Sequence, residues 1–418
     1  MRVLLLGNGG REHAIGWKLA QSPDLDLLIS APGNPGLAEF GPVVSGFDIN
    51  DPRSVTSLAI DNRVDLVVVG PEAPLASGVV DSLIAAKIRT CGPSREGAQL
   101  ESSKAYAKQV MARAGITTAP AKTFTEVTAA TDYLASRSGP FVVKADGLAA
   151  GKGVLVTEDL IAAQGWARLC IDGHFGDAGA TVVVEDYLHG PEVSIFVLTD
   201  GKTALPLAPA RDYKRLQDGD AGPNTGGMGT FSPLQGLPDE LVDWTVDSVV
   251  HPVLDVLRAD SITYRGFIYV GLILTDDGPT VLEFNSRLGD PETQVVLPRL
   301  DDDLLGLLAA TAAGELHGKP LSWLPDCAVD VVIAAEGYPE RPETGRPING
   351  IERAAAHPNA LVFHAGTSRT ADGIVSRGGR VLNVVGTGPD IPSARATAYG
   401  AVAEIELEGM HYRTDIAL

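Results

Sequence analysis

The first hundred residues alternate short apolar runs with a helical pattern, and this alternation limits the fold more than any other feature of the sequence. The apolar runs are residues 3–6, 25–30 and 66–70, and the helical pattern spans residues 12–21. Strands that alternate with helices form βαβ units, whose strands pair in a parallel sheet. We therefore expect an α/β domain with binding loops at the carboxyl ends of its strands.

Each of these strands runs into a loop of turn-forming residues, namely 7–10, 32–36 and 70–72. The first loop partly matches a dinucleotide-binding glycine motif, but Glu12 stands where the third glycine is required. No acidic residue follows the second strand to bind a ribose, so a dinucleotide site is disfavoured. The loops favour a different ligand at this edge of the sheet, with plain tight turns as the alternative.

The rest of the chain mixes strands and helices. A polar stretch from Arg211 to Pro233 is rich in glycine, and we expect a long functional loop there. The other elements expected are helices at 104–114, 304–314 and 393 to about 407, strands at 141–144, 182–185, 329–334, 361–364 and 381–385, and a hairpin of 264–275 with 281–283.

Composition excludes several classes of protein. Lys and Arg number 33 against 53 Asp and Glu, and the net charge of −20 argues against nucleic-acid or membrane partners. The three cysteines, Cys91, Cys170 and Cys327, are too far apart for a disulfide framework or a metal-binding pair. The first apolar run is too short for a signal peptide, and no apolar run is long enough to cross a bilayer. We expect a cytoplasmic protein.

A lysine and a glycine-rich loop form the first candidate site. Lys144 ends an apolar strand, and residues 147–153 follow with three glycines and Lys152. The spacing is not that of a Walker A loop, yet backbone N–H groups and two lysines suit a nucleotide triphosphate. The alternative is a surface hairpin with solvated lysines.

Two further clusters carry acidic residues. Glu283, Asn285 and Arg287 share one face if they continue a strand, which places two oxygen ligands for Mg²⁺ beside a cation. An exposed strand with a salt bridge is the alternative. The segment 185–192 offers backbone groups to an adenine edge and Glu192 to ribose hydroxyls, although a solvated turn is favoured when this segment is taken alone.

Together these clusters resemble the ATP-grasp superfamily. Segments 7–14, 70–75, 144–154, 222–229 and 283–294 also occur in the order and spacing of one family within it. The runs Gly-Pro-Asn-Thr-Gly-Gly-Met-Gly in the fourth segment and Gly-Asp-Pro-Glu-Thr-Gln in the fifth are specific to that family. Over essentially its whole length, the chain is similar to the phosphoribosylamine–glycine ligase family of purine biosynthesis.

The resemblance implies a fold and a reaction. The fold is a multidomain α/β and α+β protein with a preATP-grasp (Rossmann-like) domain at 1–102, an ATP-grasp domain at 103–325 with a mobile lid at about 121–190, and a small mixed C-terminal domain at 326–418. The family joins glycine to 5-phosphoribosylamine through glycyl phosphate, converts ATP to ADP and phosphate, and uses Mg²⁺ or Mn²⁺. We expect a monomer.

The resemblance also assigns residues to roles. Catalytic roles fall to Arg287, Lys144 and Asp212, and the metal ligands are Glu283 and Asn285. The ATP-binding residues are Lys104, Lys144, Gly151, Lys152, Gly153, Glu185, Tyr187, Leu188 and Glu192. The substrate-binding residues are Asn8, Gly9, Gly10, Gly33, Asn34, Glu72, Asn224, Thr225, Gly226, Gly227, Met228, Asp290 and Glu292.

One departure from the family pattern concerns a position next to a catalytic residue. The family often has Asp-His-Lys-Arg where this chain has Tyr213 after Asp212, which leaves open a change in substrate contacts or pH response. Three rival interpretations remain at this point: an ATP-grasp enzyme for another acid or amine, a catalytically silent nucleotide-binding regulator, and a nicotinamide dehydrogenase. The intact Lys144, Glu283, Asn285 and Arg287 argue against the silent regulator.

Overall fold

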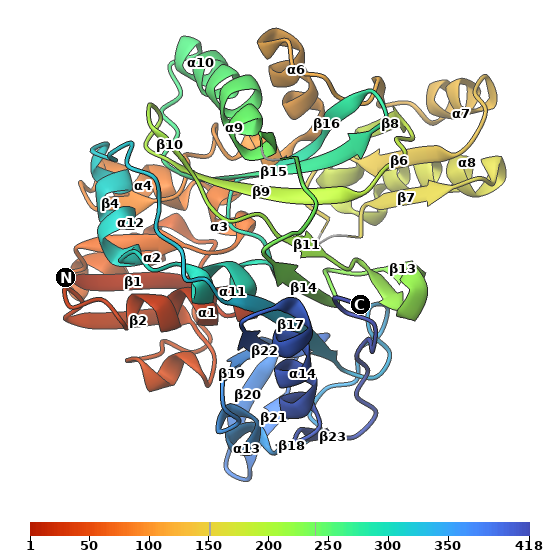
Figure 1. Cartoon of the computed structure of the whole chain (residues 1–418). Coiled ribbons are helices and arrows are strands. Elements are labelled where there is room, and N and C mark those ends of the chain that lie inside the picture. The colour runs from red at the N-terminus through yellow and green to blue at the C-terminus, as the bar shows by residue number, and fades with distance from the viewer. Residues whose placement is uncertain (150–151, 239) are drawn as a thin grey trace.

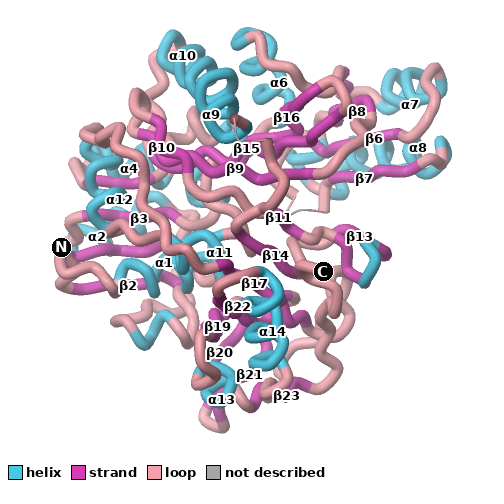
Figure 2. The backbone as a smooth tube through the Cα atoms, viewed as in Figure 1, coloured by secondary structure: helices cyan, strands magenta, loops and turns pink. Residues whose placement is uncertain are grey.

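The computed structural model describes residues 1–149, 152–238 and 240–418. Four sheets of four or five strands carry the architecture, and helices cover their faces (Figures 1 and 2). Gly151, expected to bind ATP, lies outside the described residues. Within the described ranges, no helix has the length and apolar character needed to cross a membrane.

The N-terminal sheet is parallel, in the order β2-β1-β3-β4, as the alternating pattern predicts. Val3 and Leu5 pack with helix α1 on one face, whereas Leu4 and Leu6 pack with α2 and α4 on the other. This burial of both faces explains the continuous apolar runs. The elements are β1 (Arg2–Gly7), α1 (Gly10–Leu19), β2 (Leu27–Pro32), α2 (Pro52–Asp61), β3 (Leu66–Val69), α3 (Glu72–Ser77), α4 (Val79–Ala85) and β4 (Arg89–Cys91).

The central sheet is antiparallel, in the order β10-β9-β15-β16, and its last two strands are the expected hairpin. A register shift after Gly271 interrupts the pairing of the hairpin just before Glu283. Helix α6 spans Lys104–Ala114 as predicted, because the Ser103 hydroxyl caps its first turn and Gly115 ends it in a left-handed conformation. The elements are β9 (Glu192–Thr199), β10 (Ala204–Pro206), α9 (Leu241–Thr245), α10 (His251–Ala259), β15 (Gly266–Thr275) and β16 (Gly278–Asn285).

A smaller antiparallel sheet, in the order β5-β8-β6-β7, packs against helices α7 and α8. Its strands β6 and β8 confirm those expected at 141–144 and 182–185. Figure 1 shows this unit projecting beside the end of the central sheet, with β8 near the end of β16. The elements are β5 (Ala121–Phe124), α7 (Val127–Ala135), β6 (Phe141–Ala145), β7 (Val154–Thr157), α8 (Leu160–Leu169) and β8 (Val182–Asp186).

The fourth sheet, in the order β11-β14-β17-β22-β19, and three two-stranded pairs, β12-β13, β18-β23 and β20-β21, lie in a region where the structure corrects two expectations. The segment 211–233, expected as one long loop, contains four short strands, because β14 pairs with the distant strand β17 and β12 folds back on β13. The closing helix ends at Val402 instead of about 407, and β23 then pairs with β18. The elements are β11 (Arg211–Asp212), β12 (Arg215–Gln217), β13 (Ala221–Asn224), β14 (Gly229–Ser232), β17 (Cys327–Ala334), β18 (Ile348–Asn349), α13 (Ile351–Ala355), β19 (Ala360–His364), β20 (Thr367–Thr370), β21 (Gly373–Ser376), β22 (Arg380–Gly388), α14 (Ile391–Val402) and β23 (Glu406–Leu407).

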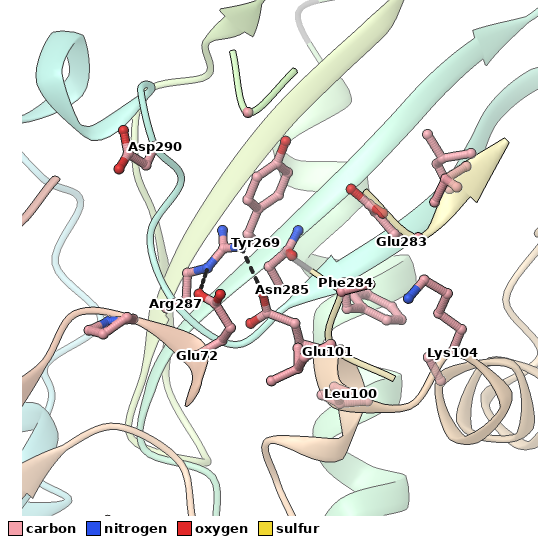
Figure 3. A pocket seen from close by; sticks show the side chains of 18 of the residues that line it. Glu72, Leu100, Glu101, Lys104, Tyr269, Glu283, Phe284, Asn285, Arg287 and Asp290 are labelled. Carbon is pink, nitrogen blue, oxygen red and sulfur yellow. Dashed lines mark hydrogen bonds and ion pairs between the residues drawn. The ribbon is translucent and has the colours of Figure 1, made fainter. Parts of the chain in front are cut away.

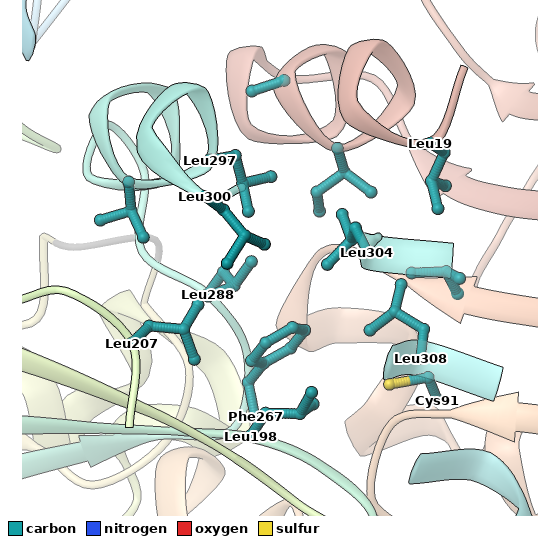
Figure 4. Packing of buried hydrophobic residues seen from close by; sticks show 14 of the residues in the cluster. Leu19, Cys91, Leu198, Leu207, Phe267, Leu288, Leu297, Leu300, Leu304 and Leu308 are labelled. Atoms are coloured by element: carbon teal, nitrogen blue, oxygen red, sulfur yellow. The ribbon is translucent and has the colours of Figure 1, made fainter. Parts of the chain in front are cut away.

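One buried apolar cluster joins the N-terminal sheet to the central sheet (Figure 4). Short helices α5 (Gln99–Ser102) and α11 (Thr293–Val296) and the longer α12 (Leu304–Ala313) connect the units. Helix α12 supplies part of the cluster, and the Asp303 carboxylate caps its first turn by accepting from two backbone N–H groups. The labelled members in Figure 4 are Leu19, Cys91, Leu198, Leu207, Phe267, Leu288, Leu297, Leu300, Leu304 and Leu308.

Candidate active site

A cavity of about 490 Å³ lies where the four sheets meet, and we call it the central pocket. Its walls come from the loop after β1, the start of α3, helices α5 and α6, strands β6, β8 and β16, and the loops that precede β12, β14 and α11 (Figure 3). Its charged lining residues are Arg11, Glu12, Glu72, Glu101, Lys104, Lys108, Lys144, Glu185, Asp212, Lys214, Glu283, Arg287, Asp290, Glu292 and Arg380.

One end of the pocket holds three lysines, two of which lie beside the same carboxylate. The Nζ of Lys144 lies 2.8 Å from Glu185, and the Nζ of Lys108 lies 3.4 Å from the other oxygen of the same carboxylate. Lys144 on β6 and Glu185 on β8 are diagonal neighbours in the sheet. Lys104 donates to the backbone oxygens of Asp146 and Gly147 at 3.3 Å, and burial lowers the pKa of its ammonium.

Glu283 and Asn285 face the same pocket from alternate positions on β16. Burial would raise the pKa of Glu283, but Lys214 and then Lys144 lower it below its ordinary value, so the carboxylate is ionised. Among the described residues, neither side chain makes a hydrogen bond or an ion pair, and their oxygens remain available to a ligand.

Arg287 lies at the middle of the pocket between two carboxylates. Its Nη2 is 2.7 Å from Glu101 and its Nε is 3.4 Å from Glu72 (Figure 3). The second oxygen of Glu101 accepts the backbone N–H of Ser286 at 2.8 Å. Burial raises the pKa of Glu101, although Arg287 opposes this effect. Two nitrogens of the guanidinium thus each face a different carboxylate, which holds the side chain of Arg287 in one orientation.

The far end of the pocket is acidic. Asp212 is inaccessible to solvent at Oδ1, which has no hydrogen-bond partner among the described residues, and burial and then Glu292 raise its pKa well above the ordinary value. Arg380 of β22 lies 3.2 Å from Asp290 and lowers the pKa of that buried carboxyl against the effect of burial. A ligand ammonium would therefore meet acceptors here, and it would favour the ionised form of Asp212.

The pocket gathers most of the residues expected at the site. Arg287, Lys144 and Asp212 line it together with Glu283 and Asn285. The other expected residues that line it are Lys104, Gly153, Glu185, Asn8, Gly9, Glu72, Thr225, Gly226, Asp290 and Glu292.

Other expected residues do not line the pocket. Asn34 instead donates to the backbone oxygens of Asn8 and His364, which fixes the loop after β1. Glu192 pairs with Lys214, and Gly227 backs onto Asp212, where a β-carbon would lie 2.6 Å from the carboxylate oxygen. The residues outside the lining are Gly10, Gly33, Asn34, Lys152, Tyr187, Leu188, Glu192, Asn224, Gly227 and Met228. Tyr213 also points away, and its hydroxyl accepts the backbone N–H of Ala417 at 3.0 Å.

The sequence interpretation missed several charged groups of the pocket. Lys108 is one helical turn beyond Lys104 on α6, and this spacing could have revealed it. Lys214 follows Asp212 by two residues in a short segment that was expected to be a loop. Glu101 and Arg380 had no local signal, because their roles depend on contacts with residues far away in the sequence.

Comparison with known proteins places the chain in a family. Residues 1–101, 102–293 and 328–418 match the family models of the phosphoribosylglycinamide synthetase N domain, ATP-grasp (A) domain and C domain. The chain is 50% identical to a phosphoribosylamine–glycine ligase of Streptomyces coelicolor, with 100% of this chain and 99% of the relative covered. It is 47% identical to one from Rhizobium meliloti, with 100% and 98% covered.

Solved structures agree with the sequence matches. The crystal structure of phosphoribosylamine–glycine ligase from Thermotoga maritima has a TM-score of 0.87, 34% identity and full coverage of both chains. A biotin carboxylase domain from Hydrogenobacter thermophilus has a TM-score of 0.73 at 16% identity, covering 98% and 91%, and therefore shares the fold alone. The resemblance and the fold expected from the sequence are confirmed, and the dehydrogenase interpretation is wrong. The chain belongs to the phosphoribosylglycinamide synthetase family of ATP-grasp ligases.

Proposed function

We propose that this chain joins glycine to 5-phosphoribosylamine and converts ATP to ADP and phosphate. The observation that carries the proposal is the central pocket itself, which brings Lys144, Glu283, Arg287 and Asp212 together with the loop after β1. Cationic, metal-binding and ammonium-binding groups then lie within one cavity. The first two suit transfer of a phosphoryl group from ATP to a carboxylate, and the third suits an acid that carries an ammonium group, as glycine does.

The first step forms glycyl phosphate. A carboxylate oxygen of glycine attacks the γ-phosphorus, and the bond from that phosphorus to the oxygen of ADP breaks. Lys104 and Lys144 would hold the phosphate oxygens, and Arg287 would balance the charge on the transferring phosphoryl group. Asp212 would accept from the glycine ammonium. The expected ATP-binding residues outside the pocket lining, Gly151, Lys152, Tyr187, Leu188 and Glu192, stay in this proposal as contacts made with nucleotide bound.

The second step forms the amide. The amine nitrogen of phosphoribosylamine attacks the carbonyl carbon of glycyl phosphate, phosphate leaves, and the nitrogen loses one proton. Asn8, Gly9 and Glu72 line the pocket beside Arg287, which supports binding of the phosphoribosyl group there. We propose that Gly10, Gly33, Asn34, Asn224, Gly227 and Met228 act by shaping these loops. Glycyl phosphate hydrolyses readily, so the unit at about 121–190 would close as a lid and exclude water.

The pocket suits a divalent metal ion that arrives with ATP. The described residues contain no cluster of three or more His, Cys, Asp or Glu side chains that could bind a metal alone. Glu283 and Asn285 offer one anionic and one neutral oxygen ligand, and Mg²⁺ usually combines one or two such ligands with phosphate oxygens. When bound, Mg²⁺ or Mn²⁺ would neutralise charge on the phosphates. We propose that either ion serves.

We also propose the organisation in which this reaction takes place. The domains would span 1–102, 103–325 and 326–418, and strands β11 and β14 of the second would complete the sheet of the third. The chain would act as a monomer in the cytoplasm, and its net charge of −20 disfavours anionic surfaces as partners.

The test is ADP release from purified protein with ATP and Mg²⁺. Glycine and freshly made phosphoribosylamine are added separately and then together, and the product is identified by mass spectrometry. We expect turnover only with both, accompanied by glycinamide ribonucleotide. ADP release with another acid or amine, and none with this pair, would refute the substrate assignment and leave the ATP-grasp fold untouched.

A further inference from the structure

A segment near the C-terminus contacts β12 and the turn between β12 and β13, a few residues after Asp212 on β11. We call residues 411–417 the anchor segment, and it runs alongside β12 and β13, where Figure 1 places the C-terminus. Hydrogen bonds join residues 411–415 to β12 and to the turn at 218–220. They link Arg413 Nη1 to Asp220 at 2.8 Å and to the Arg215 carbonyl at 3.2 Å, Asp415 to the Gly219 N–H at 2.8 Å, the Thr414 N–H to Asp218 at 2.8 Å and His411 Nε2 to the Leu216 carbonyl at 2.8 Å.

Tyr213 connects the anchor segment to the two residues on either side of it in the sequence, which line the central pocket. Its hydroxyl accepts the Ala417 N–H at 3.0 Å, and the Arg413 guanidinium lies 4.8 Å from the centre of its ring. Arg413 is itself only 1% exposed and is fixed by two 2.7 Å bonds to the Asp415 carboxylate. The aromatic ring is therefore held on the side away from the central pocket.

The neighbours of Tyr213 face the pocket. Asp212 and Lys214 line it from either side of this residue. Within the described part of the chain, the Asp212 carboxylate makes no hydrogen bond that would set its position, and its Oδ1 is buried without a partner. Its place consequently depends on the backbone, where the Tyr213 N–H donates to Gly229 at 2.9 Å and the Met228 N–H donates to Tyr213 at 2.8 Å.

We propose that the anchor segment, acting through Tyr213 and Arg413, positions Asp212 for the amino-acid substrate. This inference rests on the proposed function, in which Asp212 receives the glycine ammonium. Tyr213 and Arg413 are positioning residues, because neither lines the central pocket. Their effect is confined to the glycine end, since the lysines at the nucleotide end are carried by β6 and α6.

The experiment compares Tyr213→Phe, Arg413→Lys and the control Arg353→Lys. Arg353 also pairs with acidic side chains, Glu404 at 2.9 Å and Glu406 at 3.0 Å, but these contacts stay within residues 353–406. We expect Tyr213→Phe to raise the KM for glycine about three- to fivefold, as the loss of one neutral hydrogen bond allows. Arg413→Lys should raise it about tenfold, because lysine lacks the planar fork. The KM for ATP should stay within about twofold of wild type in all three variants.

Hydrogen exchange supplies a readout that does not depend on the substrates. Amides in peptides covering 211–228 should exchange faster in Arg413→Lys and keep their wild-type rates in Arg353→Lys. Unchanged exchange would overturn the proposal, and so would faster exchange with an unchanged KM for glycine. If the wild-type protein shows no glycine-dependent turnover, the proposed function is refuted. The exchange rates then still show whether the anchor segment stabilises residues 211–228. If Arg413→Lys does not fold, Tyr213→Phe decides.

Discussion

The replacement Arg287→Lys tests the centre of the active site. Arg287 uses Nη2 to reach Glu101 at 2.7 Å and Nε to reach Glu72 at 3.4 Å. A lysine ammonium is a point charge that can keep one of these contacts but not both. Loss of one buried charge-assisted hydrogen bond costs about 1.5–3 kcal/mol, and about 1.4 kcal/mol changes a rate tenfold. We therefore expect kcat/KM to fall about 10- to 150-fold.

The assay is ADP release with saturating ATP and varied glycine, and Arg353→Lys is the matched control. Arg353 has the same arrangement of one arginine between two glutamates, but it is exposed and does not line the central pocket. The control should retain wild-type kinetics, since exposed ion pairs contribute little. A loss below about threefold in Arg287→Lys, with correctly folded protein, would refute the view that the two-carboxylate contact sets the guanidinium for catalysis.

Three further outcomes are expected. Glu283→Gln should raise the Mg²⁺ concentration for half-maximal activity at least about tenfold, because the anionic ligand is lost; an unchanged Mg²⁺ titration would contradict the assignment. Lys108→Met should raise the KM for ATP severalfold and leave that for glycine unchanged, since Lys108 supports the Glu185 carboxylate at the nucleotide end. Arg380 lowers the pKa of Asp290 in the folded protein below its unfolded value of about 4. The ionised carboxylate therefore stabilises the folded protein above about pH 4. This stability is lost as the pH falls through the lower, folded pKa. Asp290→Asn should weaken the pH dependence of urea unfolding below about pH 4, and an unaltered dependence would contradict this.

Local sequence signals predicted the elements whose causes are local. Helix α6 has the bounds expected from the sequence, because the neighbouring residues Ser103 and Gly115 cap it, and the β15–β16 hairpin follows from two apolar runs around a turn. The strands within 211–233 could not be predicted in this way. Strand β14 exists because it pairs with β17 across about a hundred residues of chain, and glycine-rich polar sequence carries no sign of such a partner.

The same distinction applies to the active site. Lys144, Glu283 and Arg287 could be expected to share one pocket, as they do, because each lies in a short motif with a chemical meaning at its own spacing. Glu101 is recognisable only through the Arg287 guanidinium, which lies 186 positions later in the sequence and 2.7 Å away in space. Arg380 likewise acquires its role from Asp290 on another unit. A charged residue whose role is to position another charged side chain cannot be recognised from the residues next to it in the sequence.

The C-terminal unit explains how glycine-rich loops can serve as a precise binding surface. Gly226 and Gly227 allow tight turns with little steric strain. The same glycines make the unfolded loop more flexible, so that ordering the loop costs more conformational entropy. Arg380 opposes that loss by donating to the Asp290 carbonyl at 2.8 Å and to the Gly226 carbonyl, so that one partly buried guanidinium joins two loops that we propose bind the substrates. Its contacts within the described residues lie at the acidic end of the pocket, away from the lysines of α6 and β6. Damage to this unit should consequently appear as a loss of affinity for glycine or the amine while ATP binding is preserved.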